Sequence, residues 1–253
     1  MGVVAMHLES ATPFAGCSGS CHPVDIILCI AMKALTPQQP ELSIWHRSSA
    51  DERMNAATHA FGLVLAVIGA LVMAGSVAAD GDLWRTIGCG VYLASLMAVY
   101  AMSTLSHIVA APRWKLLFRR LDQGFIYLLI VATYTPFSLA YLRTGVGWAL
   151  LAAMWIVAIV GFFAKVFIGH RVEAVSLASY LLLGWMPIIA APTLFDIMPL
   201  GALLWMIGGG ICYTAGTYFL VNDERVRHFH ALWHLSVIAG SVCHFLGILI
   251  FVV

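Results

Sequence analysis

Long apolar stretches alternate with short polar ones from residue 57 to the end of the chain. A helix needs about 20 residues to cross a hydrocarbon core of about 30 Å, and seven stretches approach or exceed that length: residues 57–79, 83–106, 123–142, 146–167, 174–195, 198–220 and 229–253. Short polar segments separate them. This pattern predicts an all-α membrane protein built as a single seven-transmembrane helix bundle.

The amino-acid composition also indicates that the chain lies in a membrane. Hydrophobic residues make up 62% of the sequence and charged residues 10%, against about 45–50% and 25% in soluble domains. Mean hydropathy is +0.94. A soluble domain is therefore excluded, and a net charge of +1 gives no reason to expect nucleic acid as a partner.

The basic residues indicate how the bundle is oriented. Of the 13 Lys and Arg residues, only Arg85 and Arg143 fall on the side of the first, third and fifth loops, and the other eleven lie on the side of the N-terminus and the second, fourth and sixth loops. Lys and Arg are enriched in cytoplasmic loops. We therefore expect a cytoplasmic N-terminus and, after an odd number of spans, a C-terminus outside.

Residues 1–50 differ in kind from the rest. Their one apolar run, "VDIILCIAMKAL", is too short to span a membrane. We expect residues 1–50 to form a flexible cytoplasmic extension and residues 51–253 to form the transmembrane domain.

The stretch "VRHFHALWHLSVIAG" places histidines at the start of the last span. His230 and His234 are four residues apart, so their rings project from one helix face about 6 Å apart along the axis. The predicted topology brings His107, at the end of the second span, and Asp122, at the start of the third, to the same side of the membrane. Ser103 lies one turn before His107 on the same face.

Ionisable groups within a span usually face the bundle interior and mark a functional site. Three imidazoles with an open fourth position suit a catalytic Zn²⁺ centre, with Fe²⁺ and Mn²⁺ as alternatives. The other interpretation is that each histidine rests near the headgroups, with no metal. Asp122 could equally cap the N-terminus of its helix.

Other polar residues surround this set. Glu52, Asn55 and His59 form one helical stripe at the start of the first span. They could support or gate the metal site, or they could be a helix cap and polar rim. His244 lies ten residues, or about 15 Å, beyond His234, so it cannot bind the same ion, and we expect a core histidine bonded to a neighbouring helix.

Four motifs occur in order: "ERMNAATHAFG", "STLSH", "LDQGFIYLLIVATYTPF" and "HALWHLSVIAGSVCHF". Together they resemble the hemolysin III family, which is the bacterial branch of the progestin and adipoQ receptor family and is similar to alkaline ceramidases. The resemblance covers residues 52–253. It implies a seven-helix bundle in the bacterial inner (plasma) membrane, with a Zn²⁺ site on the cytoplasmic side held by His107, His230 and His234.

The same resemblance gives Asp122 the task of orienting a metal-bound water, with Ser103 nearby. We therefore expect a zinc-dependent intramembrane hydrolase that acts on a membrane lipid amide or ester, with Asp122 as general base and acid and Ser103 as a catalytic hydrogen-bond donor. The alternative is a non-enzymatic protein of membrane homeostasis, or a haemolysis-associated protein, in which zinc is structural. A metal transporter is less favoured, because the ligands lie on one side of the membrane and no internal repeat is evident.

Overall fold

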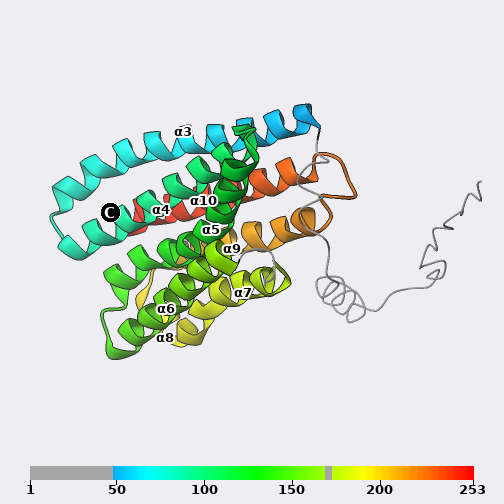
Figure 1. Cartoon of the computed structure of the whole chain (residues 1–253). Helices are drawn as coiled ribbons and strands as arrows, with labels where there is room; N and C mark the ends of the chain where they lie inside the picture. Colours follow the sequence, from blue (N-terminus) through cyan, green and yellow to red (C-terminus); the bar gives the residue numbers. More distant parts are fainter. Residues whose placement is uncertain (1–47, 169–172) are drawn as a thin grey trace, which may run out of the picture. The chain divides into compact units, whose positions relative to one another are not determined.

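The structure, a computed structural model, describes residues 48–168 and 173–253, and the apolar run of the N-terminal extension lies outside them. Helices account for nearly all of the described residues (Figure 1). They are α3 (Ser49–Asp80), α4 (Leu83–Ile108), α5 (Pro112–Tyr141), α6 (Gly145–Ile168), α7 (Glu173–Trp185), the 3₁₀ helix η2 (Met186–Ala190), α8 (Ala191–Ile197), α9 (Leu200–Val221) and α10 (Phe229–Phe251).

Within the described ranges, seven helical segments are long and apolar enough to cross a membrane, and no strand is present. The predicted all-α bundle of seven spans is therefore confirmed. The fifth span, Ser176–Ile197, is composite, because α7 gives way to η2 and then to α8. Pro187 stands in the first turn of η2 and Pro192 in that of α8, where a missing N–H is tolerated but an unbroken helix is not.

Two helices begin earlier than their apolar stretches predict. The first starts at Ser49, where the Ser48 side chain accepts a hydrogen bond from the Asp51 N–H at 3.2 Å. The third starts at Pro112, in the first turn where proline is favoured. Polar residues thus extend both helices past their apolar parts. Because Ala111 is the N-cap of α5, the possibility that Asp122 caps this helix is wrong.

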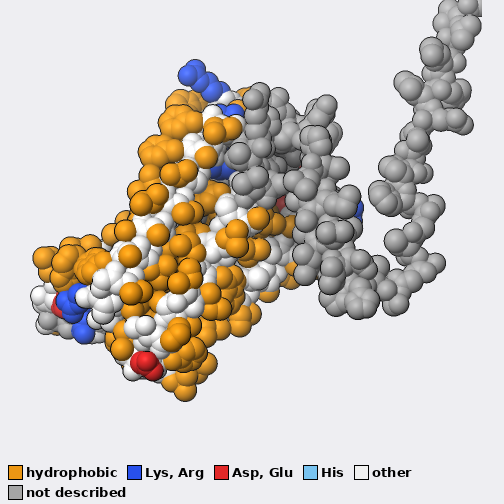
Figure 2. Space-filling view, turned by 90° about the horizontal axis from the view of Figure 1, so that it is seen from below, with side chains coloured by type: hydrophobic (Ala, Val, Ile, Leu, Met, Phe, Trp, Pro, Cys, Tyr) orange, Lys and Arg blue, Asp and Glu red, His pale blue; other side chains and the backbone are white. Residues whose placement is uncertain are grey.

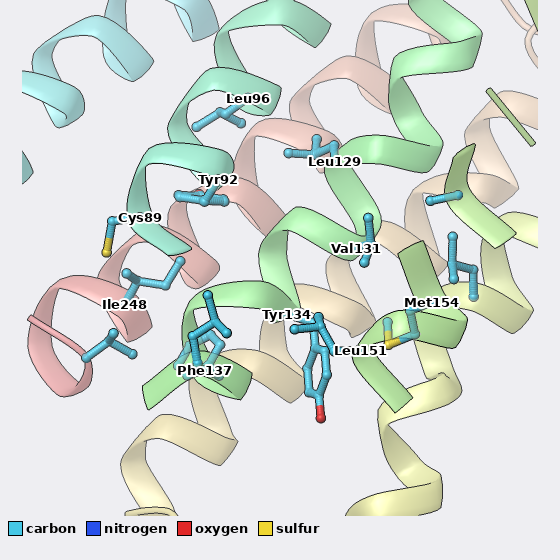
Figure 3. Close-up of a cluster of buried hydrophobic side chains, with 14 of the residues drawn as sticks. Cys89, Tyr92, Leu96, Leu129, Val131, Tyr134, Phe137, Leu151, Met154 and Ile248 are labelled. Carbon is cyan, nitrogen blue, oxygen red and sulfur yellow. The ribbon is translucent and has the colours of Figure 1, made fainter. Parts of the chain in front are cut away.

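Helices that follow one another in sequence pack side by side, and α10 packs against both α9 and α3, which closes the bundle. The most buried span is α5, in which 67% of the most apolar 18-residue stretch is buried inside the protein. Figure 3 shows side chains from α4, α5, α6 and α10 meeting around it, among them Tyr92, Phe137 and Met154. A Cβ at Gly88 would lie 2.9 Å from the Pro136 Cα, so glycine permits close contact between α4 and α5.

The outer surface suits a lipid environment. Figure 2 shows a face on which hydrophobic side chains predominate and the few visible charged groups lie toward the ends. Large apolar side chains are exposed along the spans, for example Leu71, Ile156 and Ile188. Exposure on this scale would be unusual for a soluble monomer, and it is expected of helices that face acyl chains.

Candidate metal centre

Three histidines from two helices converge at one end of the bundle. His107, in the last turn of α4, and His230 and His234, in the first turns of α10, offer ligand atoms that all lie within 4.8 Å of one another. Their ring centroids are 4.5–5.2 Å apart. His107 and His234 are buried and His230 is half-buried. The arrangement could hold a metal ion.

Each of these rings is oriented through its Nδ1. The Nδ1 of His107 bonds the Glu52 Oε2 at 2.7 Å, and that of His230 bonds the Asp223 Oδ2 at 2.6 Å. A carboxylate can only accept, so both Nδ1 atoms donate.

The Nδ1 atom of His234, the third ring, also donates a hydrogen bond. His234 Nδ1 contacts the Asn55 carbonyl oxygen at 3.2 Å and the Thr58 Oγ1 at 2.9 Å. The Thr58 hydroxyl hydrogen is already donated to that Asn55 carbonyl, at 2.8 Å, so His234 Nδ1 donates here too. All three rings therefore carry the proton on Nδ1 and the lone pair on Nε2. Metal-binding histidines almost always have such an acceptor on their other nitrogen.

Glu52 connects three helices around His107. Besides bonding His107 through Oε2, it pairs through Oε1 with Lys115 Nζ at 3.2 Å and with Arg119 at 3.8 Å, both from α5. Its side chain is only 12% exposed. The N-cap of α3 is Ser48, not Glu52, and the Glu52 carboxylate instead contacts the His107 ring.

Asn55 and His59 lie on the same stripe of α3 and are both buried. The Asn55 backbone carbonyl orients His234. The His59 ring stacks on that of His234, with centroids 3.7 Å apart, and meets Tyr100 edge-on at 5.2 Å. Neither nitrogen of His59 forms a hydrogen bond within the described part of the chain. The stripe therefore packs directly against the histidine cluster.

Ser103 and Asp122 lie together between α4 and α5. Ser103 is fully buried one turn before His107, and the Asp122 carboxyl is its neighbour. The Ser103 hydroxyl makes no hydrogen bond within 3.5 Å to any described residue. Arg119, one turn before Asp122, faces both acids, Asp122 and Glu52. Asp122 is not part of the group whose ligand atoms all lie within 4.8 Å.

The loop before α10 contributes a residue that the sequence did not single out. Asp223 lies seven positions before His230, and the left-handed conformation of His228, with φ 69°, starts the helix that carries His230 and His234. Asp51 holds this loop against α3 by contacting Arg227 at 3.3 Å and His228 at 3.5 Å. Asp223 stands in a charged loop segment, "NDERVRH", which reads as an ordinary solvated turn.

Comparison with known proteins agrees with this architecture. The haemolysin-III related family matches residues 47–245. The chain is 35% identical over 202 residues to Hemolysin-3 of Bacillus cereus, which covers 80% of this chain and 92% of that protein. It is 32% identical over 203 residues to the Hemolysin-3 homolog of Bacillus subtilis (strain 168), covering 80% and 95%. Identity to the human monocyte to macrophage differentiation factor is 29% over 204 residues, covering 77% and 81%. The resemblance expected from the four motifs is confirmed, and the chain, an integral membrane protein, belongs to the haemolysin III family.

Proposed function

We propose that this protein is a zinc-dependent intramembrane hydrolase that cleaves a lipid amide or ester. The observation that carries the proposal is a set of three histidines whose Nδ1 atoms all donate to acceptors, which leaves the Nε2 lone pairs for a metal, and whose ligand atoms lie within 4.8 Å of one another. Three neutral imidazoles are a common ligand set of catalytic zinc. Bound there, Zn²⁺ would supply a Lewis acid that polarises a carbonyl and makes hydroxide available near neutral pH.

The chain's own residues supply the proton transfers. As water adds to the carbonyl carbon, the Asp122 carboxylate accepts its proton, and the same proton passes to the leaving nitrogen or oxygen when the C–N or C–O bond breaks. The Ser103 hydroxyl, buried beside Asp122, can donate a hydrogen bond to the carboxylate or to the substrate carbonyl oxygen. The products are a carboxylic acid and an amine or alcohol.

The position of the site supports a lipid substrate. His107 lies in the span Leu83–Ile108, and His230 and His234 lie in Phe229–Phe251. All three stand in the terminal turns of these spans, so a lipid in the bilayer would meet them near the membrane surface. The distribution of Lys and Arg favours a cytoplasmic N-terminus, which would put the site at the cytoplasmic face of a bacterial inner membrane.

A second function is favoured by the way the cluster joins the helices. Glu52 of α3 contacts His107 of α4 together with Lys115 and Arg119 of α5, and His234 of α10 contacts the backbone of α3. A metal at this junction would brace four helices, which suits a non-enzymatic sensor of membrane state.

One experiment separates the two functions. The full chain, reconstituted in vesicles with bound zinc, is incubated with an N-acyl sphingoid lipid and with a diacyl phospholipid, and released fatty acid is measured by mass spectrometry. We expect release by the parent protein and by Asp196→Asn, an exposed acid on α8, and a loss of about 10²- to 10⁴-fold in Asp122→Asn with zinc retained. Full activity of Asp122→Asn would refute its role. No release of fatty acid from either class by a zinc-loaded parent would favour the sensor.

A further inference from the structure

The first turns of α5 extend beyond its apolar part. The helix begins at Pro112, whereas its apolar stretch comprises residues 123–142 and is bounded by Asp122 and Arg143. A helix of 20 residues is about 30 Å long, which matches the hydrocarbon core of a bilayer. The turns that precede residue 123 therefore lie at the level of the lipid headgroups, a layer about 5–8 Å thick in each leaflet.

The four basic residues of this segment are divided between two faces of the helix. Lys115 and Arg119 face the bundle, where both contact Glu52. Arg113 and Arg120 are seven residues apart, which places them on one face of the helix, about 10.5 Å apart along its axis. Arg113 is exposed and Arg120 is half-buried. The second pair is therefore turned toward the surroundings of the protein.

Only the inward pair is neutralised by the protein. Glu52 supplies a carboxylate to Lys115 and Arg119. Neither Arg113 nor Arg120 forms an ion pair within residues 48–168 and 173–253. A guanidinium group stays protonated in proteins. The outward pair thus presents two positive charges to a molecule that contacts this face.

The end of α6 lies next to these charges. A Cβ at Gly124 would lie 3.1 Å from side-chain atoms of both Phe162 and Val166. Consecutive spans run in opposite directions, so Arg120, which is about 6 Å earlier along α5, is level with about residue 168 of α6. Helix α6 ends at Ile168. The first turns of α5 therefore extend past the end of α6.

Apolar side chains lie toward the bilayer interior from the two arginines. Phe163 and Phe167, near the end of α6, are 51% and 74% exposed, and their rings stack with centroids 5.9 Å apart. On α5, Leu117 lies between the arginines on the same face and is 37% exposed. Two cations above exposed rings match the order of phosphate and acyl chain in a phospholipid.

Trp114 supports this depth for the start of α5. It is 53% exposed, and its ring stacks on that of Phe118 with centroids 6.4 Å apart. Trp is enriched at the level of the headgroups, where its ring is partly in apolar surroundings and its N–H is hydrated. Because Trp114 directly follows Arg113, this arginine also lies at the headgroup level and can reach a lipid phosphate.

We propose that Arg113, Leu117 and Arg120, together with Phe163 and Phe167, form a binding face for an anionic phospholipid. Guanidinium groups pair with phosphate through two parallel N–H···O bonds, and an acyl chain packs on the phenyl rings. A zwitterionic phospholipid carries the same phosphate, but its own ammonium group offsets the attraction. The face shares no residue with the histidine cluster, so it does not depend on the hydrolase proposal.

The test is native mass spectrometry of the full chain in detergent. The protein is titrated with phosphatidylglycerol and, separately, with phosphatidylcholine that carries the same acyl chains, and the dissociation constant of the first bound lipid is measured for each. A basic residue near an anionic lipid surface contributes about 5-fold in affinity. We expect phosphatidylglycerol to bind at least about 5-fold more tightly than phosphatidylcholine, and this difference to shrink as ionic strength rises.

Single substitutions locate the site. Arg113→Gln and Arg120→Gln should each weaken phosphatidylglycerol binding by about 5-fold and leave phosphatidylcholine binding unchanged. Phe167→Ala should weaken both lipids by the same factor, because it removes contact with the chain but no charge. Arg225→Gln is the matched control, since Arg225 is an exposed residue of the loop before α10 at the same end of the bundle, and it should change neither constant.

Melting temperatures without lipid show whether each variant folds. Arg120 stands at the C-terminal end of α6, where a cation is favourable, so Arg120→Gln can lower stability by itself. Arg113 lies beyond that end, and Arg113→Gln therefore tests lipid binding without this effect.

Three results would overturn the proposal. They are equal affinity for the two lipids at low ionic strength, a preference for phosphatidylglycerol that survives in the double variant Arg113→Gln and Arg120→Gln, and an equal loss of that preference in Arg225→Gln, which would indicate attraction by the overall charge of this end. The preference should persist when the three cluster histidines are replaced by Ala, and its loss in a folded triple variant would instead assign the lipid to the metal centre.

Discussion

Glu52 gives the sharpest test of how the proposed metal centre is built. Its Oε2 bonds His107 Nδ1 at 2.7 Å, and its Oε1 lies 3.2 Å from Lys115 Nζ. In Glu52→Gln the amide oxygen can still accept from His107, but the negative charge that strengthens the ligand and balances Lys115 is lost. Removing such a supporting partner typically weakens metal affinity by about 10- to 100-fold, which corresponds to about 1.4–2.7 kcal/mol.

The same substitution should also destabilise the metal-free protein. Lys115 and Glu52 have side chains only 11% and 12% exposed, so Gln at 52 leaves a mostly buried ammonium without its main counter-charge. Removing one partner of a buried ion pair lowers the free energy of unfolding by about 3–5 kcal/mol. Because both groups here keep some exposure to solvent, we expect a loss of about 3 kcal/mol or less.

Two assays separate these effects. Chelator competition in detergent measures zinc affinity, and thermal unfolding in excess chelator measures the metal-free protein. Asp196→Asn, which removes an exposed carboxylate on α8, should change neither. A zinc affinity of Glu52→Gln within twofold of the parent would refute the reasoning that Glu52 supports a ligand.

Substitutions at Asp223, His59 and Asp82 test three further contacts. Asp223→Ala should weaken zinc binding by about 10- to 100-fold, since Asp223 orients His230; chelator competition checks this, and unchanged affinity would contradict it. His59→Phe should keep the fold, because the His59 ring stacks on His234 and neither of its nitrogens is bonded in the described residues. His59→Ala should lower the free energy of unfolding by about 2–5 kcal/mol, because it leaves a cavity. Equal melting temperatures of the two variants would argue that His59 does not act through packing. The backbone N–H of Arg85 lowers the pKa of Asp82 below its usual 3.8, so the stability that this carboxylate contributes is present above about pH 4 and falls as pH drops through the lowered pKa. Asp82→Asn should flatten that part of the melting profile, and an unchanged profile would contradict the assignment.

The number and class of the elements could be predicted because apolar length is a direct physical requirement of a membrane span. The ends of the helices could not, since polar residues can continue a helix beyond the bilayer. α5 begins at Pro112, eleven residues before the apolar stretch at residue 123, and this displacement is why Asp122 could be mistaken for a cap.

Helix periodicity and topology were enough to predict the three histidines of the candidate site, but not the residues that contact them. The four-residue spacing of His230 and His234 and the shared end of His107 follow from those two rules, and the structure brings all three rings together. Asp223 could not be found in this way, because its approach to His230 depends on the turn conformation of residues 222–228. Likewise, nothing in the spacing of Lys115 and Arg119 indicates that both contact Glu52.

Direct measurement of bound metal tests the central claim most plainly. Elemental analysis would compare the detergent-purified parent with a variant in which His107, His230 and His234 are all replaced by Ala. We expect about one zinc ion per chain in the parent, as a single three-histidine site requires, and none in a variant that remains helical by circular dichroism. A well-folded parent without metal, or a triple variant that still binds one zinc per chain, would contradict the account.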